Sequence, residues 1–591
     1  MLRRALLLGI LLAVVTAGSA AAAADRYRLA GGCYDLARGG ETLAGPLRLK
    51  ASGLGRYLLY TAGGTFLSAP NFVPLEAAGP STDWTVTGRR GDFHLTPQTG
   101  DAAPGTFAFR PATGCADFPE ADTDVDGPVS RGAAPWAGTR GLIDSHFHWM
   151  AADMFGGDAH CGRAWSPYGI ARAMVDCPDH APGGAGLQFE NLLSGASPTA
   201  VHDTVGWPTF KDWPNPRSLT HENAYYRWVQ RAYEGGLRMT VVLFFDNAQL
   251  CGVWPEREHD CDEMASIRRE IGLLKDMRDY IDAQAGGPGR GFMRIVRSPF
   301  AARRAINHGK LAVVMGIETS RLFDCRVLDG VPQCDRATID RELAEMRRLG
   351  IRSLEITGKF DNALAGVAGD PGTNGIITNT GNRLETGRFL AMGSCEGLPS
   401  GAVDKEQLAF GPLGEPLASL IGNPGASPVY PPPPHCNALG LSDLGAYLMN
   451  QIVDHHMIMD PDHMSANARI AALDIMQQRK YSGLISSHSW STPVDEPRII
   501  NLGGVVFPKA TAIGQASTTD WFTSEYARLK QLRNPKYFWG FGYGSDINGV
   551  AKQPTARPQA NVKYPVPSFD GRQTVQQMTT GQRVWDYNRD G

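Results

Sequence analysis

Apolar residues recur along most of this chain in short continuous runs, and these runs alternate with segments whose apolar positions follow helical spacing. Continuous apolar runs separated by helices are typical of strands buried on both faces of a parallel sheet. Eight such runs follow residue 138: 141–148, 239–245, 311–318, 352–357, 457–462, 483–487, 504–507 and 537–545. Amphipathic helices are predicted between or beside them at 222–233, 262–284, 338–349, 442–455, 466–479 and 519–532. The pattern predicts an α/β fold, a closed (β/α)8 TIM-type barrel.

The pattern is different before the barrel, where short β-like runs are broken by Gly, Pro and Asp. It predicts a small N-terminal all-β domain, for which the sequence indicates no chemistry of its own. The predicted order is a signal peptide at 1–24, the all-β domain at 25–126, a linker at 127–138 and the barrel at 139–591, with insertions at 150–237 and 359–441. Both insertions follow the C-terminal end of a predicted strand. In barrels of this kind that end holds the active site, so we expect the insertions to form its walls or lid.

The first 24 residues have the three parts of a secretory signal: a basic start, an apolar stretch and an Ala-rich end. The apolar stretch is shorter than the roughly 20 residues that span a bilayer. We therefore expect a secreted protein with no integral membrane segment after signal removal. A formal charge of −3 and a pI near 6.5 argue against nucleic acid as a partner and favour a small molecule or short peptide.

Ten cysteines in an exported chain predict disulfides, although the sequence leaves their connectivity open. Neighbours along the chain give the pairs Cys33/Cys115, Cys161/Cys177, Cys251/Cys261, Cys325/Cys334 and Cys395/Cys436. No Cys-x-x-Cys occurs. A thiolate metal site or a redox pair is therefore disfavoured, and any metal ligands should be histidines and carboxylates.

Two histidines, His146 and His148, end the first apolar run at a spacing that places both side chains on one face of a strand. Two ligands alone do not define a metal site, but other candidates follow later strands: Glu318, His463, His488 and Asp546. The C-terminal ends of barrel strands meet at one end, so these residues should converge. They are the inventory of a site for two divalent ions of the zinc class, bridged by a carboxylate and by a water that becomes hydroxide near neutral pH.

Six motifs in order carry a family resemblance: Asp144-Ser145-His146-Phe147-His148, Gly316-Ile317-Glu318, Gly440-Leu441-Ser442, Asp460-Pro461-Asp462-His463, Ser487-His488-Ser489 and Gly544-Ser545-Asp546-Ile547-Asn548-Gly549. Together they resemble the membrane dipeptidase family of the amidohydrolase superfamily. The resemblance implies hydrolysis of an amide or peptide bond by a metal-bridging hydroxide. It also implies that His146 and His148 bind one ion, Glu318 bridges, and His463 and His488 bind the other. Asp546 would act as general base and acid.

The sequence departs from the family pattern at two positions. His148 stands where the family has Asp, and Gly358 stands where it has the histidine that holds the substrate carbonyl. Lys359 is the candidate to replace that histidine. Arg498 approximates the family's carboxylate-binding arginine, although an exposed arginine without this role fits equally well. Both departures favour an alternative, a metal-dependent esterase, lactonase or phosphotriesterase of the same superfamily. A non-catalytic secreted binding protein is the remaining alternative.

Overall fold

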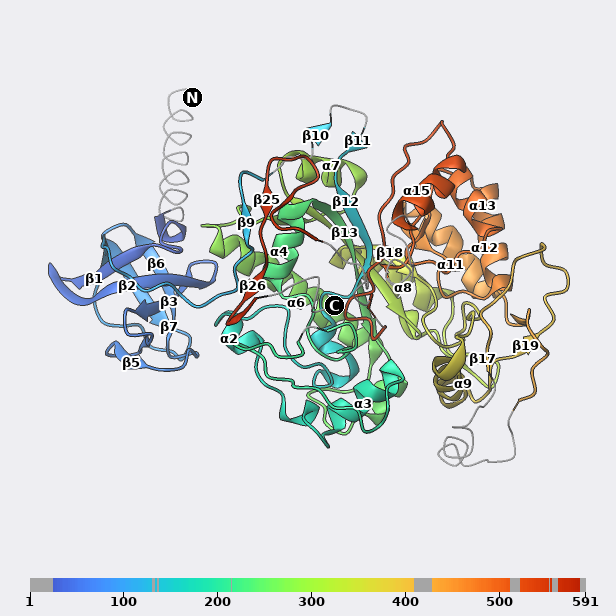
Figure 1. Ribbon diagram of the computed structural model, residues 1–591, viewed down its shortest axis with the longest axis horizontal. Helices are drawn as coiled ribbons and strands as arrows, with labels where there is room; N and C mark the ends of the chain where they lie inside the picture. Colours follow the sequence, from blue (N-terminus) through green and yellow to red (C-terminus); the bar gives the residue numbers. More distant parts are fainter. Residues whose placement is uncertain are drawn as a thin grey trace, which may run out of the picture. The chain divides into compact units, whose positions relative to one another are not determined.

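The computed structural model describes residues 25–129, 133–134, 138–213, 215–408, 428–510, 521–551, 553–554 and 562–584. The chain divides into two compact units (Figure 1). One comprises Met1–Ala121, Trp165–Met174 and Leu274–Arg294, and the other comprises Asp122–Ala164, Val175–Leu273 and Ile295–Gly591. The predicted signal peptide lies outside the described residues, as does part of the predicted linker. None of the helices described is long and apolar enough to cross a membrane.

The first unit contains an antiparallel β-sheet, as the sequence pattern predicts. Its strands are β1 (Cys33–Arg38), β2 (Glu41–Gly53), β3 (Arg56–Thr61), β4 (Phe66–Ser68), β5 (Val73–Leu75), β6 (Asp83–Arg89), β7 (Asp92–Pro97) and β8 (Ala108–Pro111). Alternating side chains meet in an apolar core around Trp84, whose indole N–H donates to the Leu67 carbonyl at 2.8 Å. The C-terminal half of a long helix, α6 (Glu263–Gln284), also belongs to this unit and adds Ala283 to its core.

The second unit is built on parallel strands. Strands β12 (Leu142–Phe147), β13 (Leu237–Asp246), β15 (Leu311–Thr319), β18 (Ile351–Glu355) and β21 (Ile458–Asp460) pair in chain order. Two further strands, β22 (Ile485–Ser486) and β23 (Val505–Val506), pair with each other in parallel, and a parallel bridge joins Met459 to Leu484. These strands correspond to the first seven apolar runs of the sequence. The mixed α/β class with a parallel sheet is therefore confirmed.

The eighth predicted strand, 537–545, is not a regular strand. Parallel bridges link Tyr543 to Asp144, Ile547 to Phe147 and Gly544 to Lys509. The backbone N–H of Ser145 donates to the Tyr543 carbonyl at 2.8 Å. The segment around residues 543–547 therefore lies beside β12, on the opposite edge from β13, and the sheet curls.

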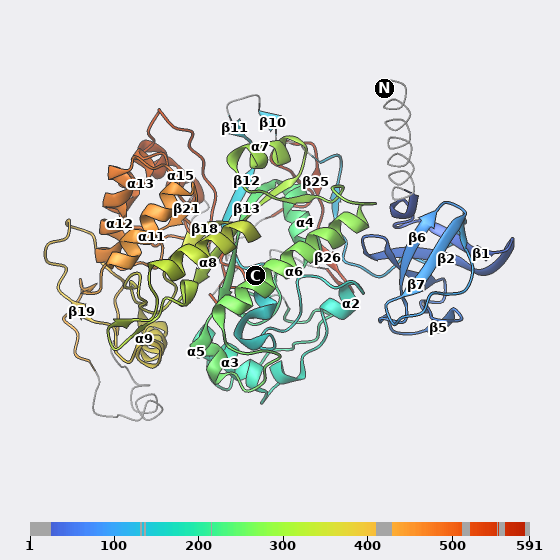
Figure 2. The ribbon, with the colours of Figure 1, turned by 180° about the vertical axis from the view of Figure 1, so that it is seen from behind.

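Figure 2 shows α8 (Arg336–Leu349) on the outer side of the parallel strands. By contrast, α7 (Pro299–Asn307) packs its buried Ala302, Ala305 and Ile306 into one apolar core with residues of several strands, among them Val241 and Val314. Further described helices of the second unit are α11 (Asp443–Asp454), α12 (Ala466–Gln478), α13 (Asp495–Asn501) and α15 (Trp521–Gln531). Side-chain caps fix where several begin: the Ser442 hydroxyl accepts from Gly445 N before α11, and Ser465 accepts from Ala468 N before α12. On α12, Ala468, Ala472 and Met476 recur every four residues and are buried.

The two insertions contain short elements. In and around the first lie η1 (Ala151–Gly156), α2 (Ile170–Ala173), η2 (Pro178–His180), α3 (Ala185–Ser194) and α4 (Tyr226–Gly235), which begins four residues later than predicted. After β13 come α5 (Ala248–Val253) and β14 (Met293–Ile295), and after β15 come η3 (Leu322–Asp324), β16 (Val327–Leu328) and β17 (Val331–Pro332). The second insertion contains α9 (Gly372–Thr386), which the sequence reading missed, with β19 (Met392–Gly393) and β20 (Cys436–Asn437).

All five predicted cysteine pairs are bonded, and no described cysteine is free. Cys33–Cys115 connects the start of β1 to the segment after β8. Cys161–Cys177 lies in the first insertion, and Cys395–Cys436 lies in the second. Such bonds persist in oxidising compartments.

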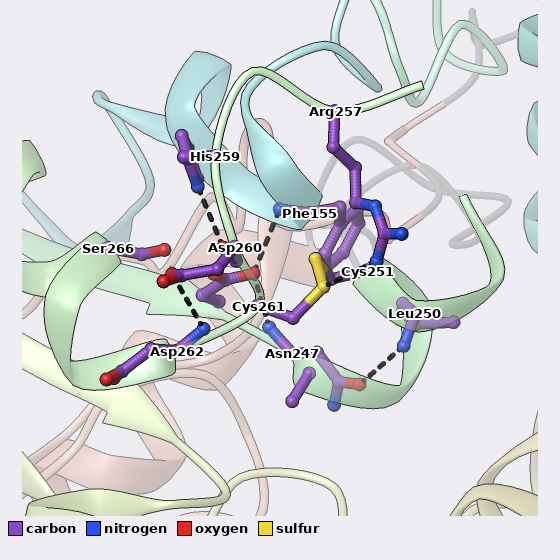
Figure 3. The surroundings of a disulfide bond; sticks show 12 residues. Phe155, Asn247, Leu250, Cys251, Arg257, His259, Asp260, Cys261, Asp262 and Ser266 are labelled. Carbon is purple, nitrogen blue, oxygen red and sulfur yellow. Dashed lines mark hydrogen bonds between the residues drawn. A yellow bond between two sulfur atoms is a disulfide. The ribbon is translucent and has the colours of Figure 1, made fainter. Parts of the chain in front are cut away.

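The other two disulfide bonds lie in strand-end loops outside the two predicted insertions. Figure 3 shows Cys251–Cys261, which closes the loop after α5, the helix that Asn247 caps by accepting from Leu250 N at 3.0 Å. Cys325–Cys334 closes the loop between β15 and α8, with its Cα atoms 4.9 Å apart. Cys325 is buried after η3, whereas Cys334 is partly exposed just before α8. This bond therefore encloses the short β16–β17 pair.

The chain's last described residues form short antiparallel pairs. Strand β24 (Val566–Pro567) pairs with β25 (Thr574–Val575), which pairs with β9 (Val125–Asp126), and β26 (Thr579–Thr580) pairs with β27 (Arg583–Val584). Two other short antiparallel pairs are β10 (Ala133–Ala134) with β11 (Gly138–Thr139), and β19 with β20. The C-terminal segment therefore returns to the residues that precede the parallel sheet.

Candidate metal centre

The six predicted site residues lie at the C-terminal ends of the parallel strands and are buried. They are His146 in β12 and His148 just after it, Glu318 in β15, His463 after β21, His488 after β22, and Asp546 in the eighth segment. Parallel pairing brings these ends together because every strand runs the same way. The register places Glu318 opposite Phe245 of β13 and Glu355 of β18.

Glu318 lies between two pairs of histidines. Its Oε2 is 3.2 Å from His146 Nε2 and 3.4 Å from His148 Nε2. Its Oε1 is 3.1 Å from His463 Nε2. Within each pair the Nε2 atoms are 3.1 Å apart, His146 with His148 and His463 with His488. Each carboxylate oxygen therefore faces a different group of nitrogen donors.

The other ring nitrogens are held by neighbouring groups. His148 Nδ1 lies 3.1 Å from the Leu243 carbonyl, and His488 Nδ1 lies 3.0 Å from Asp462 Oδ2. A carbonyl or carboxylate only accepts, so these Nδ1 atoms carry a hydrogen. Partners of this kind fix the orientation of metal-binding histidines. His148 is therefore oriented with Nε2 toward Glu318, and His488 is oriented with Nε2 toward His463.

Trp490 closes one side of the cluster. Its indole N–H donates to His488 Nε2 at 2.9 Å, which shows that this nitrogen is an acceptor. An ion bound by His488 would have to displace this hydrogen bond. The ammonium groups of Lys359 and Lys405 each lie 5.0 Å from the centre of the Trp490 ring. The cluster therefore has a wall made of one aromatic ring and two cations.

Asp546 joins the cluster from the eighth segment. Its Oδ1 lies 3.3 Å from His148 Nε2, and its Oδ2 lies 2.5 Å from Lys509 Nζ. Burial alone would raise its pKa, but the facing Lys509 and the two histidines hold the pKa of Asp546 well below its usual range. Asp546 has a left-handed backbone, with φ 52°. A Cβ at Gly549 would lie 2.0 Å from Asp546 Oδ1, so only glycine leaves room for this carboxylate.

Glu355 also belongs to the cluster, although the sequence analysis did not predict it as a site residue. Its Oε1 lies 3.3 Å from His146 Nδ1 and accepts from the Ser487 hydroxyl at 3.2 Å. Its Oε2 is buried without a hydrogen bond, 3.9 Å from His463 Nε2. Burial and the nearby charge of Glu318 raise the pKa of Glu355 to about 8. In the sequence, Glu355 could have been identified as an ionisable residue at the end of a predicted buried strand.

Gly358 and Lys359 follow β18 near the cluster. A Cβ at Gly358 would lie 3.1 Å from Ser320 N, so the backbone after β15 already fills the space beside this glycine. Lys359 Nζ pairs with Asp370 at 3.3 Å. Burial would lower the pKa of Lys359, but Asp370, with Glu318 and Asp546, raises it. Lys359 is therefore a charged group beside the histidines.

Arg498 lies elsewhere. It is on α13, and its guanidinium contacts Asp474 at 2.5 Å and Gln477 at 2.6 Å, both on α12. These contacts hold the side chain between two helices on the outer side of the strands. The contacts do not bring it into the histidine cluster, where the predicted substrate-binding arginine would lie.

The disulfide cysteines add no ligand to the strand-end cluster. The groups of possible metal ligands at the described strand ends consist of histidines and glutamates. Cys334 illustrates the difference, because its sulfur is bonded to Cys325 in the loop before α8 and cannot act as a thiolate ligand. The cysteines therefore hold loops together, as the sequence predicts, while histidines and carboxylates supply the donors.

Comparison with known proteins gives only distant structural matches. No family model matches the sequence, and no curated protein matches it. A probable dipeptidase, PvdM, from Pseudomonas aeruginosa matches at 16% identity and TM-score 0.29, over 54% of this chain and 60% of its own. The dipeptidase AC, a metallo peptidase of family M19, matches at 12% identity and TM-score 0.33, over 71% of this chain and 88% of its own.

A third match is a metallo peptidase from Rhodobacter sphaeroides, solved with a phosphinate mimic of the dipeptide L-Ala-D-Ala. It is 12% identical with TM-score 0.33, over 56% of this chain and 78% of that one. The chain spans 60% of the length of the PvdM structure. What the strand-end cluster does must therefore follow from its own residues, which form a buried group of four histidines and two glutamates able to hold metal ions.

Proposed function

We propose that this chain is a hydrolase that depends on two divalent metal ions of the zinc class, held at the strand ends. The observation that carries the proposal is Glu318, whose two carboxylate oxygens face different histidines: Oε2 faces His146 and His148, and Oε1 faces His463. A carboxylate placed in this way would bind two ions at once. His488 completes the second pair of nitrogen donors.

The donor set fits such ions. Imidazole nitrogen and carboxylate oxygen are the ligands that zinc-class ions take. Glu355 Oε2, buried without a hydrogen bond, is a further oxygen donor beside His463. When bound, the ions would polarise the reacting bond of the substrate and lower the pKa of bound water to about 7.

Asp546 would move the proton. Its Oδ1 faces the histidines, while Lys509 holds Oδ2 at 2.5 Å and so fixes the side chain. A carboxylate in this position can take a proton from the attacking water at Oδ1 and return it to the leaving group. The buried surroundings exclude bulk water that would compete for that proton.

We propose an amide or short peptide as the substrate. Lys359 and Lys405 beside Trp490 give the cluster a cationic wall, which would bind the free carboxylate of a small peptide. A second candidate is an ester, lactone or phosphotriester. Gly358 favours it, because this position has no side chain to hold a developing oxyanion and has tight packing against Ser320. Loss of one such donor typically costs about 10²–10³ in rate.

We also propose the wider organisation that the sequence predicts. Eight segments would close into a (β/α)8 barrel over residues 139–591, preceded by an all-β domain at 25–126 and a linker at 127–138. The parallel bridges from Tyr543 to Asp144 and from Lys509 to Gly544 support closure. Removal of residues 1–24 would accompany secretion, which the five disulfides support.

The test combines metal analysis with a substrate panel. Purified protein should carry about two ions per chain at the strand ends and should hydrolyse dipeptides, lactones or phosphotriesters only when metal is present. Glu318→Gln should lose at least one ion, while Arg498→Ala, whose contacts lie on α12, should keep both. Full occupancy in Glu318→Gln would refute the bridging role. A metal-loaded chain that hydrolyses none of the panel would favour a non-catalytic binding protein.

A further inference from the structure

A second group of histidines lies in the first insertion, outside the strand-end cluster. Its members are His160, His180, Glu190, His202 and His221, all within the second compact unit. Four of them are at most 5% exposed, and His202 has a side chain 19% exposed. Buried histidines and glutamate need partners, because an unpaired polar group away from water costs free energy.

Glu190, on α3, is the centre of this group. Its Oε1 lies 2.8 Å from His202 Nε2, and its Oε2 lies 3.0 Å from His221 Nδ1. One donor atom from each of these three residues lies within 4.8 Å of the other two. The rings of His202 and His221 are 5.2 Å apart, and those of His180 and His221 are 4.7 Å apart. The residues therefore form one compact set of nitrogen and oxygen donors.

Several nitrogens of this set have no hydrogen-bond partner although they are buried. They are both ring nitrogens of His160 and of His202, and His221 Nε2. His180 Nδ1 instead lies 3.1 Å from Asp179 Oδ2. The 2.8 Å contact of His202 with Glu190 thus lacks hydrogen-bond geometry. Protein atoms usually satisfy buried imidazoles. So many unsatisfied nitrogens around one carboxylate are a donor set that a cation would satisfy.

We propose that Glu190, His202 and His221 bind one divalent transition-metal ion of the zinc, copper or nickel class, with His160 as the neighbouring further imidazole. The site is structural. Its ligands come from α3, from the loop at residue 202 and from the backbone bridge between Cys161 and His221, next to the Cys161–Cys177 bond. An ion there would fasten segments of the insertion that the disulfide alone does not join. The proposal does not depend on the hydrolase function.

The test counts ions in variants of the full chain. After dialysis against buffered Zn²⁺, His202→Ala should hold one ion fewer than wild type, whereas exposed His308→Ala should hold the same number. In the Glu318→Ala background, which weakens the strand-end centre, the insertion ion should remain and should disappear when His202→Ala is added. His202 is only half-buried, so its variant should fold, and circular dichroism checks this.

A second readout separates the site from the rest of the chain. Zn²⁺ should slow proteolytic cleavage within residues 150–237 of wild type and should have no such effect on His202→Ala or Glu190→Gln. Co²⁺ loaded into the Glu318→Ala chain should give visible absorption that His221→Gln lowers by the contribution of one ion. Equal metal content in wild type, His202→Ala and Glu190→Gln would overturn the proposal, even if the strand-end centre binds its two ions.

Discussion

Replacing Asp546 with Asn tests the proton-transfer step directly. The substitution keeps the size of the side chain and one oxygen near the histidines, but it removes the negative charge that faces Lys509 at 2.5 Å. It also removes the basic oxygen that lies 3.3 Å from His148 Nε2. Asp546 is not needed as a metal ligand in the proposed centre, because Glu318 and four histidines already supply donors.

The expected loss follows from the role of the carboxylate. A positioned general base typically contributes about 10²–10⁴-fold to the rate, which corresponds to about 2.7–5.4 kcal/mol of transition-state stabilisation. The cost in folding stability should be smaller. Breaking a fully buried ion pair costs about 3–5 kcal/mol, but the Lys509 side chain is 23% exposed and can regain water. We therefore expect about 1–2 kcal/mol of lost stability after this discount.

The assay measures kcat, KM and metal content together on whichever substrate the panel identifies. For Asp546→Asn, metal content should stay at the wild-type value while kcat falls by about 10²–10⁴. Lys509→Met keeps the base but frees its side chain, so it should lose only about tenfold, since a positioning group contributes less than the base itself. Near-normal kcat in Asp546→Asn would refute this mechanism, and loss of metal would make Asp546 a ligand instead.

Three further predictions concern single features. Trp490→Phe removes the N–H that donates to His488 Nε2. Because the bound ion no longer has to displace this hydrogen bond, metal affinity measured by competition with a chelator should rise about 2–10-fold. An unchanged affinity would contradict this prediction. Gly549→Ala should lower kcat at least about tenfold because its Cβ would meet Asp546, whereas Gly540→Ala, with open space, should be neutral. Peptide mapping without reduction should recover five linked cysteine pairs, and a free thiol would contradict the pairing.

The sequence determined those features that depend on local pattern. Apolar runs long enough for buried strands marked seven strands that the structure contains, because burial on both faces of a parallel sheet requires continuous apolar residues. His146, Glu318 and His463 were recognised as candidates because they lie at the ends of those runs. Burying an ionisable side chain there costs free energy unless the side chain is paired or has a function. Short spacing also predicted Cys251–Cys261 and Cys325–Cys334, since nearby cysteines meet with little loss of chain entropy.

Only the tertiary structure decided which groups surround those residues. Glu355 ends its strand much as Glu318 does, but strand register places its carboxylate against His146 and His463. Lys509 reaches Asp546 across 37 residues, and Trp490 reaches His488 through a turn. No periodic pattern in the sequence predicts either contact. Such pairings depend on how loops pack at the strand ends.

Dependence on tertiary packing also explains why the sequence does not predict the histidine group of the first insertion or the strand pairing of the C-terminal segment. Glu190, His202 and His221 come from separate irregular segments, so nothing in their spacing along the chain indicates that they share one buried place. The pairing of β25 with β9 joins residues about 450 positions apart. Periodicity reports only which face of an element is buried. Where two distant segments meet is set by the packing of the whole unit, and this packing decides the surroundings of both candidate sites.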